Sequence, residues 1–73
     1  MEIITLKNGL KFVILAKVEL NEERYLYLSS YGEEDINFIF AKVNDDKTIE
    51  PIENGEVIVE LLKIIEEKQK KDN

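Results

Sequence analysis

Histidine, cysteine and tryptophan are all absent from this 73-residue sequence. Histidine is the side chain whose charge ordinarily changes near neutral pH, and cysteine is a ready nucleophile and metal ligand. Their absence removes the usual groups for acid–base catalysis, thiol chemistry and zinc binding. The three glycines are isolated from one another, so none belongs to a phosphate-binding loop. We therefore expect no catalytic residue, no cofactor and no metal site.

Long apolar runs are missing as well. The longest uncharged apolar run, residues 12–16, is far shorter than the roughly 20 residues that cross a bilayer. No basic stretch followed by an apolar one marks a targeting segment, so we expect a soluble protein. Hydrophobic residues still form 44% of the chain, which indicates a folded domain rather than a disordered segment. We expect one domain over residues 1–67 and a flexible charged tail over 68–73. The lack of cysteine fits a reducing cytoplasm.

Negative charge is concentrated in the middle of the chain. The net charge is −6, and residues 33–60 alone carry −7, because they hold nine acids and two lysines. Residues 1–32 are neutral and residues 61–73 carry +1. A surface of this sign repels nucleic-acid phosphates and attracts basic partners. We expect no direct binding of nucleic acid.

The first hairpin can be predicted down to its register. Asn8-Gly9 favours a tight turn between a strand over residues 2–7 and a longer strand over 10–20. A three-residue loop with Gly9 in a left-handed bulge would pair Ile4 with Phe12. A two-residue loop would put the apolar sets of the two strands on opposite faces. We predict the bulged turn.

The second strand shows an uninterrupted period of two, which predicts one continuous apolar face. The residues on this face are Leu10, Phe12, Ile14, Ala16, Val18 and Leu20.

The third strand, residues 24–30, alternates leucine with tyrosine. We expect Leu26 and Leu28 to face the core, and Tyr25 and Tyr27 to lie on the opposite, partly hydrated face.

Two further strands and a helix complete the expected fold. Residues 36–43 place Phe38 and Phe40 on one face, and Pro51 confines the strand over 49–52 to an edge of the sheet. Asn54 is a candidate N-cap for a helix whose apolar stripe ends at Ile65. The predicted fold class is α+β: an antiparallel meander of four to five strands with one C-terminal helix packed on its apolar face.

The candidate interaction residues are two tyrosines and an acidic loop: Tyr25, Tyr27, Glu33, Glu34 and Asp35. The loop lacks the alternating ligand spacing of a calcium site and has the composition of a solvated turn. Aromatic residues on neighbouring strands also resemble an RNA-stacking platform, but their acidic surroundings argue against that function. Exposed tyrosines suit a protein interface.

Three segments resemble the DUF1292 (UPF0473) family of small acidic bacterial proteins of unknown function. They are residues 2–6 followed by Asn8-Gly9, residues 24–28 before an acidic loop, and residues 49–53 before the last helix. The chain departs from the family pattern in its shorter acidic loops and in having Glu56-Val57-Ile58 where an aromatic residue is usual. The resemblance implies a bacterial cytoplasmic protein, and it implies no activity and no functional residues.

The leading hypothesis is a noncatalytic protein-interaction or regulatory module, a monomer or weak homodimer, whose partner has a basic surface. The alternative is an acidic decoy whose carboxylates imitate nucleic-acid phosphates and occupy a nucleic-acid-binding protein. The two hypotheses differ in salt response, since salt screens a charge-based complex more strongly than an apolar contact.

Overall fold

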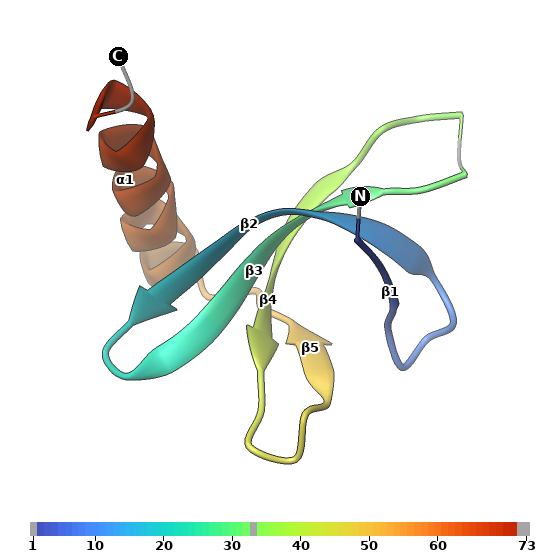
Figure 1. Cartoon of the computed structure of the whole chain (residues 1–73). Coiled ribbons are helices and arrows are strands. Elements are labelled where there is room, and N and C mark those ends of the chain that lie inside the picture. Colours follow the sequence, from blue (N-terminus) through green and yellow to red (C-terminus); the bar gives the residue numbers. More distant parts are fainter. Residues whose placement is uncertain (1, 33, 72–73) are drawn as a thin grey trace.

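A curled antiparallel sheet and one helix make up the fold, as predicted (Figure 1). The computed structural model describes residues 2–32 and 34–71. The strands follow one another across the sheet in chain order, which is a simple meander. The elements are β1 (Ile3–Thr5), β2 (Lys11–Leu20), β3 (Glu23–Ser30), β4 (Phe38–Val43), β5 (Ile49–Pro51) and α1 (Gly55–Lys71).

The first hairpin has the predicted register. Ile4 lies opposite Phe12, and Gly9 adopts a φ of 84°, a left-handed conformation that favours glycine. The Gly9 amide donates to the carbonyl of Leu6, and the Leu6 amide donates to the carbonyl of Leu10. The bulged turn is therefore confirmed.

The continuous apolar face predicted for β2 is wrong. Ile14 lies opposite Leu28, whereas Ala16 lies opposite Tyr27, so Leu15 is an extra residue in a β-bulge. An extra residue shifts the side-chain alternation by one position. Phe12 and Ile14 consequently share the face of Leu28, whereas the apolar residues after the bulge share the face of the tyrosines.

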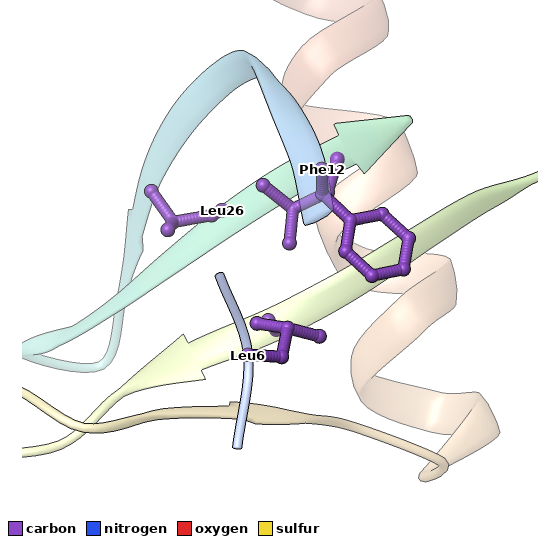
Figure 2. Packing of buried hydrophobic residues seen from close by; sticks show 5 residues of the cluster. Leu6, Phe12 and Leu26 are labelled. Carbon is purple, nitrogen blue, oxygen red and sulfur yellow. The ribbon is translucent and has the colours of Figure 1, made fainter. Parts of the chain in front are cut away.

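The concave face of the sheet contains the first of two hydrophobic clusters (Figure 2). Leu6 from the first hairpin packs in this cluster together with Ile49 from β5, although these residues lie at opposite ends of the meander. Lys7 Nζ lies 3.9 Å from Glu50 Oε1, which also connects the two ends of the sheet. The sheet thus curls around its own core. The buried members are Leu6, Phe12, Leu26, Leu28 and Ala41.

Helix α1 covers part of the opposite, convex face, which contains the second cluster. Leu61 is fully buried and packs with Val18, Tyr25 and Phe40. We expected the helix on the face of Leu26 and Leu28, and that expectation is wrong. The bulge moves Val18 to the tyrosine face, and curling already buries the leucine face, so the helix packs where apolar surface remains.

The start of α1 agrees with the sequence, and the helix extends beyond Ile65, where its predicted apolar stripe ends. The Asn54 side-chain oxygen accepts hydrogen bonds from the amides of Glu56 (3.0 Å) and Val57 (3.4 Å), which confirms the N-cap. The helix continues to Lys71, into the segment for which we predicted a flexible tail. Glu66 and Glu67 precede lysines by four residues, a spacing that supports helix. Residues 72 and 73 lie outside the described residues.

Candidate functional site

Tyr25 does not lie on a hydrated face. Its side chain is 7% exposed and packs under α1 with Val18, Phe40 and Leu61. Its hydroxyl group donates a hydrogen bond of 3.1 Å to Glu23 Oε2. The expectation of an exposed Tyr25 is therefore wrong, and the cause is again the bulge, which gives this face enough apolar residues to hold a helix.

Tyr27 marks the border of the area that α1 covers. It is half-buried, and its ring stacks on Phe40 at a centroid distance of 4.7 Å and on Phe38 at 5.8 Å. Phe40 is 5% exposed, whereas Phe38, on the same face of the same strand, is 57% exposed. The area of the sheet that α1 covers thus ends between these two phenylalanines.

Beyond this border lies an apolar surface that we call the open half of the convex face. The register places Ile3, Val13, Ser29 and Phe38 side by side across four neighbouring strands. Ile3 is 42% exposed, and Val13 and Ser29 are half-buried. Exposed apolar residues that adjoin one another across a sheet are typical of interaction sites. The sequence identified Phe38 as a strand residue but could not show that it is uncovered.

The acidic loop is anchored beside this open half. Ser30 Oγ donates to the carbonyl oxygen of Asp35 (3.1 Å) and accepts from the amide of Asn37 (3.0 Å). Glu34 and Asp35 are both exposed. Glu33, the third predicted member of the loop, lies outside the described residues. The structure therefore brings Glu34 and Asp35 close to the start of β4 and separates them from the buried Tyr25.

A polar cluster that sequence reasoning missed joins Glu23, Tyr25 and Lys42. Lys42 Nζ lies 3.0 Å from Glu23 Oε2, the oxygen that also accepts from Tyr25. Bonding to Lys42, and then to Tyr25, lowers the pKa of Glu23. Burial and the bond to Glu23 raise the pKa of Tyr25, and the bond to Glu23 raises that of Lys42. All three pKa values are shifted farther from pH 7 than the ordinary values of these groups. A general acid or base that works near pH 7 requires the opposite shift, toward the working pH.

Two open clefts accompany these features. One, of about 820 Å³, lies between the β2–β3 and β4–β5 turns and is lined by charges of both signs, among them Arg24, Lys42 and Asp45. The other, of about 560 Å³, has Ile14 and Leu26 among its lining residues. The buried Tyr25 also lines the second cleft, but its hydroxyl group is already bonded to Glu23. Among the described residues no buried side-chain nitrogen or oxygen lacks a hydrogen-bond partner, so neither cleft offers a buried polar group that is free to orient a small ligand.

No group of three or more aspartates and glutamates is arranged to hold an ion within residues 2–32 and 34–71. Over the same residues, no helix combines the length and apolarity that a membrane span requires.

Comparison with known proteins yields no relative for this chain. No family model, no curated protein and no solved structure matches it.

Proposed function

We propose that this protein is a noncatalytic interaction module that contacts a protein partner through the open half of its convex face. The observation that carries the proposal is the exposure of Phe38, which is 57% exposed next to the stacked and half-buried Tyr27. Burying such an aromatic side chain on binding contributes about 2 kcal/mol. Aromatic residues in an accessible apolar patch are common anchors of protein interfaces.

The setting that we propose is the bacterial cytoplasm. Its support is the lack of cysteine and the resemblance of residues 2–6, 24–28 and 49–53 to the DUF1292 (UPF0473) family. The proposal places no catalytic step on the chain, and the acidic character of residues 33–60 favours a partner with a basic surface.

A capture experiment with matched variants tests this function. The wild-type chain, Phe38→Glu and Val59→Glu are immobilised, exposed to bacterial lysate, washed at low and high salt, and analysed by mass spectrometry. Val59 is 51% exposed on α1, so it controls for adding a charge at an exposed apolar site. Circular dichroism first establishes that each variant is folded.

We expect one protein to stay bound at high salt to the wild type and to Val59→Glu, and to be reduced about tenfold or more on Phe38→Glu. Equal retention by all three chains would contradict the proposal, and so would turnover of a small molecule by the purified protein. The loss of every captured protein as salt rises would instead favour the acidic decoy. The acidic residues do not specifically support the decoy hypothesis, because these negative charges are not gathered at one place. Asp35 and Asp45, for example, lie beyond opposite ends of β4.

A further inference from the structure

The outer edge of β4 is only partly paired. Strand β5 pairs with residues 41–43, and the amide of Ile52 adds one bond to the carbonyl of Phe40 (2.9 Å). Within the described ranges, no strand pairs with this edge before Phe40. Figure 1 shows β5 beside only the end of β4 that is distant from the β3–β4 loop. The remaining edge, residues 36–39, is available to another chain.

The backbone groups of Phe38 point away from the sheet. The carbonyl of Asn37 accepts from the amide of Ser30 on β3, and the carbonyl of Phe40 faces Ile52 on the other side. Because successive residues of a strand alternate in the direction of their hydrogen-bonding groups, the amide and carbonyl of Phe38 share the outward direction of Phe40. An added strand would find a donor and an acceptor there.

Within its four residues, this segment lacks the charge and the proline that protect β5. Strand β5 contains Glu50 and Pro51, and charge and proline each discourage strand addition. Residues 36–39 are Ile-Asn-Phe-Ile, with no charge and no proline, and Ile36 is 68% exposed.

We propose that an extended segment of a basic partner protein adds to this edge as a sixth strand. This inference rests on the proposed interaction function and names its mode. Glu34 and Asp35 lie next to the free edge, so positive residues at the end of the incoming segment would meet them. A second copy of this chain carries the same charge of −6 and is repelled, which makes self-pairing the weaker alternative.

The geometry also defines the side chains of the segment. In an added strand, alternate residues join Phe38 on the convex face and Ile39 on the concave face. The residues beside Phe38 extend the apolar row that begins at Ile3, so we expect aliphatic or aromatic side chains at every second position, with lysine or arginine beside Asp35.

Peptide titration followed by amide NMR tests the proposal. The probe is a synthetic peptide of alternating valine and threonine with two lysines at each end, and its control has glutamates in place of the lysines. We expect the basic peptide to shift the amides of residues 36–39, to slow hydrogen exchange at the Phe38 amide, and to bind at least about tenfold more tightly than the control. The proposal is overturned by equal affinities, by no binding, by shifts confined to other regions, or by concentration-dependent protection of Phe38 without peptide, which would identify a second copy as the occupant.

A backbone substitution separates this mode from the interaction function. The chain can be made by chemical synthesis with an ester in place of the Phe38 amide, which removes the outward donor and keeps the side chain. Peptide binding should weaken about fivefold, as expected for the loss of one hydrogen bond. Unchanged affinity would overturn strand addition. If lysate capture still depended on the Phe38 side chain, the proposed interaction function would stand, and only strand addition as its mode would be rejected.

Discussion

Ile14 and Ala16 lie two positions apart on one strand and face opposite sides of the sheet, because Leu15 between them is bulged. In a regular strand they would share a face. The bulge divides the apolar residues of β2 between two clusters: Phe12 lies in the concave cluster, and Val18 lies under the helix. In this sequence the bulge therefore places apolar residues of β2 on both faces of the sheet.

Deletion of Leu15 should remove the bulge and still allow folding. Without Leu15, Ile14 and Ala16 become adjacent and alternate normally, so Ala16 and Val18 keep their partners on β3 and still face α1. We expect a cooperative thermal transition in circular dichroism. Leu15→Ala is the matched comparison: it keeps the bulged backbone, and because Leu15 is 49% exposed it should cost about 1 kcal/mol. Loss of the cooperative transition in the deletion variant would contradict the assignment of Leu15 as the extra residue.

Leu61 should contribute more to stability than its neighbour Leu62. Leu61 is fully buried against Val18 and Tyr25, whereas Leu62 is 46% exposed. We expect Leu61→Ala to lower the free energy of unfolding by about 3 kcal/mol, because it removes buried contacts and leaves a cavity. Leu62→Ala should cost less than about 1 kcal/mol. Urea denaturation of both variants measures the difference, and equal losses would show that the helix does not dock through Leu61.

Local features of the fold were predictable from short segments. Asn8-Gly9 determined the first turn and Asn54 the helix start, because each acts through its own backbone conformation or side-chain hydrogen bond. The alternation of Leu26 and Leu28 with tyrosine also assigned their faces correctly, with both leucines buried. These features involve residues that are close to one another in the chain, so a short stretch of sequence is enough to predict them.

The bulge and the open half were not predictable, for a different reason. Leu15 is an apolar residue in an apolar run, and no glycine or proline marks it as extra. Phe38 and Phe40 have the same residue type and face, and only the position of the distant α1 makes one exposed and the other buried. The location of the candidate site thus depends on tertiary packing. The alternation of apolar residues along a strand assigns faces, but it does not show which part of a face another element covers.

Two glycines should respond in opposite directions to replacement by alanine. Gly9 has a φ of 84°, so Gly9→Ala should cost about 1 kcal/mol through backbone strain, although nothing lies within 4 Å of the added methyl group. Gly55, the first residue of α1, has no such conformation and equal space. Gly55→Ala should stabilise the protein by about 0.5 kcal/mol, because alanine favours helix. Thermal unfolding distinguishes the signs, and a destabilised Gly55→Ala would contradict this reasoning.

The ion pair between Glu23 and Lys42 should make stability depend on pH at both extremes. The pKa of Glu23 is lower in the folded chain than its ordinary value of 4.5, so its contribution is present above pH 4.5 and is lost as pH falls through the folded value. The pKa of Lys42 is raised above 10.5, so its contribution is present below pH 10.5 and is lost as pH rises through the folded value.

Glu23→Gln removes the carboxylate from this pair. We expect its free energy of unfolding to fall below that of the wild type at pH 7, and the gap to close as pH falls from 4.5 toward 3. Glu22→Gln is the control, because it removes one negative charge from the same turn and leaves the Glu23–Lys42 pair intact. Urea titrations at pH 7, 4.5 and 3 measure both variants. If their pH profiles coincided, the loss at low pH would reflect net charge alone, since only Glu23 contacts Lys42 and Tyr25 through its carboxylate in this cluster.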